Sequence, residues 1–234
     1  MKPVLLFIPG MLNDERVWRD VIAQMHDLAE VRVADVLSQD SMATMAHDAL
    51  GLLKDVGPER PVHLVGFSMG GYVAIELLAT HPTRWNAALL MSTSCLPDSE
   101  QSAAGREKAI AAFKADFETT VQGVALRGLA QPNPSLQNRL CEMMRDVGAA
   151  TAIRQTQAIS RRTDHRTALG ALKLPVHVMC GRQDRITLPV WSQTLADTIP
   201  ASTLHWVDDA GHMLPMEHPL AIEAVLRQML TCRK

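Results

Sequence analysis

Aromatic residues are scarce in this chain, and so is any imbalance of charge. Phe, Trp and Tyr make up 4% of its 234 residues, and the formal net charge is −2. A near-neutral chain without a run of like charges gives no reason to expect nucleic acid or an anionic membrane as a partner. No stretch approaches the ~20 consecutive apolar residues that span a bilayer. We therefore expect neither nucleic-acid binding nor membrane association.

Cysteines are also few, and they are scattered as Cys95, Cys141, Cys180 and Cys232. They form no C-x-x-C pair, and no two histidines have metal-ligand spacing on one helix face, so we expect no metal. Pro9-Gly10 cuts off the short apolar run at the N-terminus well before it reaches the length of a signal-peptide core. These features predict reduced, mostly buried thiols in a cytoplasmic protein.

Short apolar runs of strand length alternate with helical segments along most of the chain. Hydrophobic residues make up 47% of the sequence, enough for one generous globular domain. Strand-to-helix alternation is typical of βαβ units, which form a parallel sheet covered by helices on both faces. The predicted strands cover residues 4–8, 31–33, 62–65, 87–91, 176–180 and 203–207.

The alternation is interrupted between residues 97 and 168, where no strand-like run occurs. Helical segments are predicted there near 103–114, 117–129, 136–147 and 149–160. We interpret this stretch as a helical insertion between two strands of the sheet. The chain would then consist of a core of residues 1–96 and 169–234, with 97–168 inserted.

Residues 61–80 join an apolar strand to a helix through Gly66-Phe67-Ser68-Met69-Gly70. This segment matches G-x-S-x-G, in which a sharp strand-to-helix turn exposes the serine hydroxyl above the sheet. The turn leaves no room for a Cβ at the flanking positions, which explains the two glycines. The N–H groups at the start of the following helix can stabilise an oxyanion. The sequence therefore predicts that Ser68 is a nucleophile.

A serine nucleophile needs a base, and the base needs an acid that orients it. Both are expected after the serine, each in a loop that follows a later strand. Asp184 follows the predicted strand 176–180, and His212 follows the strand 203–207. Asp208 and Asp209 are alternative acids, but they precede His212 so closely that the loop would have to fold back on itself. We therefore predict His212 as the base and Asp184 as the acid.

Four segments together resemble the α/β-hydrolase superfamily over nearly the whole chain: Pro9-Gly10 with Trp18 downstream, the segment 66–71, Gly-x-x-Asp at 181–184 with Pro189, and Gly211-His212 before Pro215, Glu217 and Pro219. Many members carry His-Gly where this chain has Pro9-Gly10, and the family's first two antiparallel strands have no counterpart here. The resemblance implies an α/β-hydrolase fold with a reduced, mostly parallel six-stranded sheet, helices on both faces, and a helical cap formed by the insertion.

The resemblance also implies roles for individual residues. Ser68 would be the nucleophile, His212 the base and Asp184 the acid. The oxyanion hole would consist of the backbone N–H groups of Met11 and Met69. Since these donors belong to the backbone, replacing His-Gly by Pro9-Gly10 should not abolish the hole. No cofactor is expected.

Several other side chains allow two interpretations. Trp18, Met91, Leu96 and Met213 could line an apolar substrate pocket or simply pack in the core. The cap arginines Arg154, Arg161 and Arg162 could bind a substrate carboxylate or form a solvated helix face. Of the remaining histidines, His63 and His177 are interpreted as structural because they lie within strands, and His165 is a lesser candidate for the pocket.

Together these features predict a serine hydrolase that cleaves a carboxylic ester, thioester or lactone of a small to medium acyl group through an acyl-enzyme. The same triad could instead support C–C bond hydrolysis, a lyase reaction, or cofactor-free perhydrolase or haloperoxidase-like chemistry. A non-catalytic ligand receptor is a third possibility. The expected partner is a small ester-like molecule, and the expected assembly is a monomer or homodimer.

Overall fold

A six-stranded sheet forms the centre of the computed structural model, which describes residues 2–231. The strand order is β2-β1-β3-β4-β5-β6, and every neighbouring pair is parallel. This confirms the predicted reduced sheet, which is wholly rather than mostly parallel. The strands are β1 (Val4–Ile8), β2 (Glu30–Val33), β3 (Val62–Phe67), β4 (Ala87–Met91), β5 (Val176–Gly181) and β6 (Ser202–Val207).

The strand sequences are apolar because the inner strands are buried on both faces. Every residue of β1, β3, β4 and β5 is buried, whereas the edge strands β2 and β6 are largely half-buried. Successive side chains point to opposite faces. Accordingly, Leu6 and Ile8 belong to one hydrophobic cluster, and Leu5 and Phe7 belong to the other. The two clusters form the core on the two sides of the sheet.

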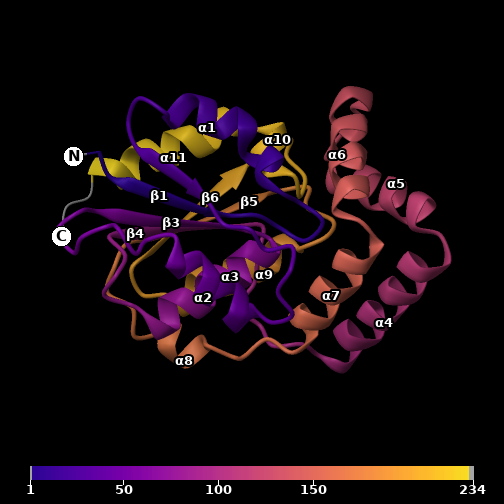
Figure 1. Ribbon diagram of the computed structural model, residues 1–234, viewed down its shortest axis with the longest axis horizontal. Coiled ribbons are helices and arrows are strands. Elements are labelled where there is room, and N and C mark those ends of the chain that lie inside the picture. The colour runs from indigo at the N-terminus through magenta and orange to yellow at the C-terminus, as the bar shows by residue number, and fades with distance from the viewer. Residues whose placement is uncertain (1, 232–234) are drawn as a thin grey trace.

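Helices cover both faces, as predicted (Figure 1). One layer contains the 3-10 helix η1 (Glu15–Trp18), α1 (Arg19–Met25) and α11 (Pro219–Thr231), with the short α10 (Leu214–Glu217) beside them. The opposite layer contains α2 (Met42–Gly51), α3 (Met69–Thr80) and α9 (Pro189–Thr198). Helix α8 (Arg166–Leu169) packs against α3 in this second layer.

Four of the helices between β4 and β5 are here called the cap. They are α4 (Glu100–Ala115), α5 (Phe117–Gly128), α6 (Pro134–Val147) and α7 (Ala149–Ser160), and they group together at one end of the sheet (Figure 1). Side-chain caps fix three of their starts: Ser99, Asp116 and Asn133 each accept a backbone N–H from the first turn. The division into a core of 1–96 and 169–234 and an insertion of 97–168 stays a prediction.

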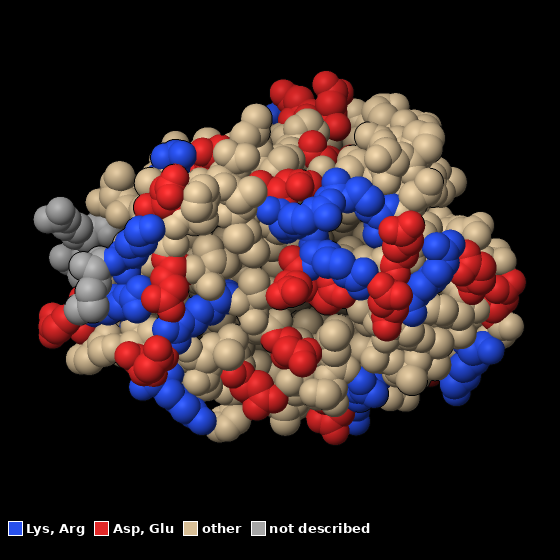
Figure 2. Space-filling model, turned by 45° about the horizontal axis from the view of Figure 1, so that its top comes forward, with Lys and Arg blue, Asp and Glu red and all other residues tan. Residues whose placement is uncertain are grey.

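Basic and acidic side chains lie interspersed over the face of the molecule drawn in Figure 2. None of the helices within residues 2–231 has the length and apolar character needed to cross a bilayer. Cys95, Cys141 and Cys180 are free and buried, whereas Cys232 lies outside the described residues. The cytoplasmic location and the monomer-or-homodimer assembly stay predictions.

Candidate active site

The candidate site lies where the order of the strands reverses. From β1 the chain goes first to the edge strand β2 and then back to β3 on the other side of β1. The loops after β1 and β3 therefore diverge at the carboxyl end of the sheet, the usual position of a ligand crevice in parallel α/β folds. The loop after β1 contains Met11, and the turn after β3 contains Ser68.

Ser68 lies in a sharp turn with an uncommon backbone conformation, φ 54° and ψ −116°. Three hydrogen bonds hold this turn: the Ser68 N–H donates to Met91 O, and Ser68 O accepts from Gly71 N–H and the Thr93 hydroxyl, each at 2.9 Å. A Cβ at Gly70 would come within 2.1 Å of Ile8 O. The start of α3 is thus packed directly against the end of β1, and this contact places the serine beside the loop that follows β1.

Ser68, His212 and Asp184 form a hydrogen-bonded row. His212 Nε2 lies 2.9 Å from Ser68 Oγ, and His212 Nδ1 lies 2.8 Å from Asp184 Oδ2. Because a carboxylate accepts from Nδ1–H, Nε2 is left as the acceptor for the serine hydroxyl. His212 and Asp184 are 4% and 3% exposed. This arrangement can move a proton from the serine oxygen to the imidazole in a largely water-excluded setting.

Asp184 is fixed by its own loop. Its Oδ1 accepts from the N–H groups of Ile186 and Thr187 at 2.8 and 2.9 Å, so both carboxylate oxygens are engaged. The alternative acids point elsewhere: Asp208 is 82% exposed at the side chain and pairs with Arg182, while Asp209 lies 3.5 Å from Gln183 Nε2. Of the three aspartates considered from the sequence, Asp184 alone contacts His212.

Glu217 holds the loop that carries the histidine. Its carboxylate accepts from Gly211 N–H at 3.1 Å and from Ala130 N–H at 2.7 Å, which joins the histidine loop to the segment after α5. Burial raises the pKa of the Glu217 carboxyl, and the two backbone donors oppose that shift. The sequence contains Glu217 within its matched motif but gave no indication of this bridging role.

The loop after β1 is tied to the cap by Gln155, a residue that sequence reasoning missed. Gln155 in α7 is fully buried; its Oε1 accepts from Leu12 N–H, and its Nε2 donates to Val36 O, both at 2.9 Å. Leu12 has a φ of 59°, which is uncommon for a residue with a side chain. Among the described residues no hydrogen-bond acceptor contacts the N–H of Met11 or of Met69. These two amides remain available to a ligand.

A cavity of about 400 Å³ opens over Ser68 and is bounded by the core on one side and the cap on the other. Met11, Met69 and Ser68 line it together with Thr187 and Trp191 from the core. The cap contributes Ser102, Gly105, Arg106, Ala109, Arg127, Thr156 and Ile159. The serine and both predicted oxyanion-hole residues therefore face one common space.

Three of the four predicted pocket residues do not line this cavity, and the prediction is corrected for them. Trp18, Met91 and Met213 are 0–2% exposed. Trp18 packs on Phe7 with ring centroids 4.9 Å apart. Their apolar side chains are taken up by the core beneath the site. Leu96 lines a smaller adjoining cavity of about 130 Å³.

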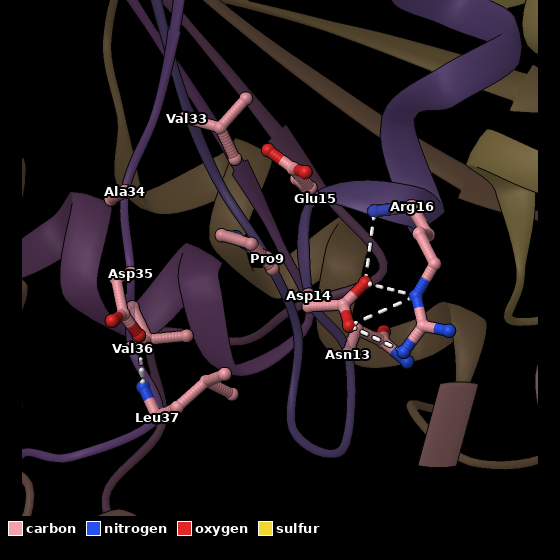
Figure 3. Close-up of a pocket in the computed structure, with 10 residues that line it drawn as sticks. All are labelled: Pro9, Asn13, Asp14, Glu15, Arg16, Val33, Ala34, Asp35, Val36 and Leu37. Carbon is pink, nitrogen blue, oxygen red and sulfur yellow. Dashed lines mark hydrogen bonds and ion pairs between the residues drawn. The ribbon is translucent and has the colours of Figure 1, made fainter. Parts of the chain in front are cut away.

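A separate cavity, of about 310 Å³, lies between the loops after β1 and β2 and does not include Ser68 (Figure 3). Its walls carry Asp14, Glu15 and Asp35. The Asp14 carboxylate is bonded to Arg16, and Asp35 Oδ1 accepts from Leu37 N–H. Within residues 2–231 no group of His, Cys, Asp or Glu side chains is arranged to hold a metal ion.

The cap arginines differ from one another. Arg161 is exposed, and Arg154 donates to Leu37 O. Arg162 is 9% exposed at the side chain and pairs with Asp98 at 2.6 Å. It is therefore not part of a solvated helix face. His165 pairs with Glu76 at 2.7 Å, away from Ser68.

A fold of this kind with a serine at the strand-to-helix turn defines the class, and the comparisons with known proteins agree. A family model described as "Alpha/beta hydrolase family" matches residues 5–225. The chain therefore belongs to the α/β-hydrolase family.

Individual relatives are distant. A pimeloyl-[acyl-carrier protein] methyl ester esterase of Neisseria meningitidis serogroup A is 24% identical over 180 residues, which cover 74% of this chain and 58% of that protein. A 3-oxoadipate enol-lactonase of Acinetobacter baylyi is 24% identical over 97% of this chain and 90% of that protein. Among solved structures, a thermophilic esterase from Thermogutta terrifontis has a TM-score of 0.85 and 26% identity, covering 98% of this chain and 89% of that chain.

Proposed function

We propose that this protein is a serine hydrolase that cleaves a carboxylic ester, thioester or lactone of a small to medium acyl group. The observation that carries the proposal is the hydrogen-bonded row from Ser68 through His212 to Asp184 beneath a roofed cavity. The names of distant relatives, an esterase and an enol-lactonase, point to the same bond types.

The reaction begins when Ser68 Oγ attacks the carbonyl carbon and its proton passes to His212 Nε2. Asp184 holds the imidazole in the required tautomer and stabilises the imidazolium that forms. The negative charge on the carbonyl oxygen is stabilised by the N–H groups of Met11 and Met69, each worth about 3 kcal/mol in such a site. No cofactor takes part in these steps.

The tetrahedral intermediate then collapses. The imidazolium returns its proton to the leaving alkoxide or thiolate, which departs as the alcohol or thiol, and the acyl group remains on Ser68. Water attacks this acyl-enzyme with His212 as the base, and the acid is released with Ser68 restored. His212 and Asp184 are 4% and 3% exposed, and this low exposure to water strengthens the electrostatic contact between them.

A series of p-nitrophenyl esters of increasing acyl length tests this proposal. We expect turnover by the native protein that Ser68→Ala reduces to the background rate, with an unchanged circular-dichroism spectrum. The exposed Ser160→Ala is a control that should keep full activity. Equal turnover by Ser68→Ala and the native protein would rule out Ser68 as the nucleophile.

A second reaction class has one specific observation in its favour. A protein of Enterobacter named 2-succinyl-6-hydroxy-2,4-cyclohexadiene-1-carboxylate synthase is 26% identical over 99% of this chain and 93% of that protein. The same constellation could thus serve a lyase-type reaction. Labelling of Ser68 by a fluorophosphonate without turnover of any ester would favour this alternative.

A further inference from the structure

The cavity over Ser68 and the smaller cavity beside it are lined by arginines. Arg106 and Arg127 line the first, and Arg106 and Arg162 line the second. The two spaces share Arg106, Tyr72, Ser102 and Trp191, so they adjoin each other. Among the described residues, neither lining includes an aspartate or a glutamate. A concave site with cations and no opposing carboxylate on its wall attracts anions.

Arg106 and Arg162 share one carboxylate, that of Asp98. Arg106 Nε and Nη2 each donate to Asp98 at 2.7 Å, and Arg162 Nη1 donates to Asp98 Oδ1 at 2.6 Å. Their side chains are 23%, 9% and 11% exposed for Arg106, Arg162 and Asp98. Burial alone would raise the pKa of Asp98, but the two guanidinium groups outweigh it and lower that pKa. The trio therefore carries a net positive charge at neutral pH.

Arg162 is held in place by contacts of its own. Its Nη2 donates to Leu96 O at 2.6 Å, its Nη1 donates to Ile159 O at 2.9 Å, and its guanidinium lies 4.7 Å above the ring centre of Tyr72. Arg106 differs because its bonds to Asp98 use Nε and Nη2. Within residues 2–231 its Nη1 has no carboxylate partner, and Arg106 lines both spaces. Arg106 is thus the fixed cation with donor capacity left for a ligand.

Arg127 adds a second cation to the wall of the main cavity. Its Nε donates to Arg185 O at 3.0 Å, and it makes no ion pair with a carboxylate in residues 2–231. It is exposed, and a solvated cation contributes less than a half-buried one. We therefore assign the specific contact to Arg106.

We propose that Arg106 binds a carboxylate on the substrate, so that the ester cleaved at Ser68 carries a second group with a negative charge. This inference rests on the proposed hydrolase function and names its substrate class. Guanidinium groups recognise carboxylates through paired, charge-assisted hydrogen bonds, which Lys reproduces poorly. The carboxylate can belong to the acyl part or to the alcohol part of the ester, and two pairs of substrates distinguish these sources.

The acyl-side pair is mono-p-nitrophenyl adipate and its neutral primary amide. The alcohol-side pair is 4-(butanoyloxy)butanoate and its primary amide, followed by acid release in a pH-stat. Within a pair the two esters have nearly the same shape and differ in charge. We expect kcat/KM to favour the carboxylate in one pair, and that preference to fall by about 10- to 100-fold in Arg106→Gln.

The preference is the ratio of kcat/KM for the carboxylate ester to kcat/KM for its amide, measured on the same variant. Because both values scale with the amount of folded protein, a loss of folded protein does not change the ratio. Arg106→Lys should retain only part of the preference. The control is Arg145→Gln, which makes the same change of charge in the same cap at a residue paired with exposed Glu118 outside both cavities. It should leave the ratio unchanged.

Equal kcat/KM for the carboxylate and the amide in both pairs, or an equal ratio in native protein and Arg106→Gln, would overturn the proposal. Turnover of none of the four esters would overturn it as well. The hydrolase function is judged separately, by loss of p-nitrophenyl butanoate turnover in Ser68→Ala. That function can stand while the assignment of Arg106 fails.

Discussion

The side chain of Gln155 in the cap accepts a hydrogen bond from the backbone N–H of Leu12 in the loop after β1. The two atoms are 2.9 Å apart and their residues are 143 positions apart in the chain. The other end of the same amide donates to Val36 O, so one buried side chain joins the cap to two loops at the carboxyl edge of the sheet. Met11, which precedes Leu12, carries one of the proposed oxyanion donors. The cap thereby supports the loop that must hold this donor in position.

Gln155→Leu should therefore lower kcat as well as stability. The substitution leaves Leu12 N–H and Val36 O without partners, at about 1–3 kcal/mol each, and a small displacement of the donor costs up to about 100-fold in rate. Ester turnover normalised to the folded sites titrated by a fluorophosphonate measures the effect. Gln157→Leu, an exposed change in the same helix, is the control. A normalised kcat equal to that of the control would show that Gln155 serves stability alone.

Asp184→Asn should reduce kcat by about 10⁴-fold because an amide no longer enforces the imidazole tautomer that accepts the serine proton. Asp208→Asn provides the matched control, since that aspartate is exposed and pairs with Arg182 at the surface. Steady-state turnover of a p-nitrophenyl ester separates the two. If Asp208→Asn is the variant that loses activity, the acid has been assigned to the wrong loop.

Gly70→Ala should destabilise the protein by about 3 kcal/mol, because the new Cβ would meet backbone oxygens that cannot move without distorting β1. That Cβ would lie 2.1 Å from Ile8 O and 2.6 Å from Pro9 O. Gly123→Ala in α5 is the matched control, since nothing lies within 4 Å of its Cβ and alanine favours a helix. The urea concentrations at the unfolding midpoints of Gly70→Ala and Gly123→Ala measure the difference in stability. Equal midpoints for the two variants would mean that the serine turn is looser than described.

Stability should fall as the pH drops from about 6.5 towards 4, in part because of His63. This residue on β3 is 1% exposed with no partner for Nδ1, and burial lowers its pKa to about 4. Below pH 6.5 the imidazole of His63 is protonated in the unfolded chain but stays neutral in the folded chain. The free energy of unfolding therefore falls by ~3 kcal/mol once pH 4 is reached. His63→Leu should make the loss of unfolding free energy between pH 7 and 4.5 smaller than it is in the native protein.

The exposed His26→Leu is the control for that measurement, and it should keep the native pH dependence. A pH profile of His63→Leu that coincides with the profile of this control would place the acid sensitivity in other groups. Buried His177 and its half-buried neighbour His205, whose pKa values are also lowered by burial, are the next candidates for it.

The sheet and its helices followed well from the sequence because buried parallel strands and amphipathic helices leave clear local patterns. The strand predicted at 87–91 is observed as β4 with the same bounds, and Pro189 begins α9 as predicted. The four-residue helices α8 and α10 were not predicted because one turn is too short to show a periodic pattern. Ser68, Asp184 and His212 could be chosen because each follows a strand, and strand ends meet at one edge.

Contacts that depend on the cap could not be predicted in this way. Gln155 looks like an ordinary polar residue of a helix, and the bond between Arg162 and Asp98 joins residues 64 positions apart. Trp18, Met91 and Met213 illustrate the opposite error, since hydrophobic character alone does not distinguish a pocket wall from the core beneath it. Such distinctions require the orientation of the cap on the sheet.

The most direct test is to locate the adduct of a fluorophosphonate probe by peptide mass spectrometry. We predict one equivalent of label on Ser68, no label in Ser68→Ala, and labelling slowed by orders of magnitude in His212→Asn because the base is lost. Equal labelling of Ser68→Ala, or an adduct on a different residue of the native protein, would contradict it.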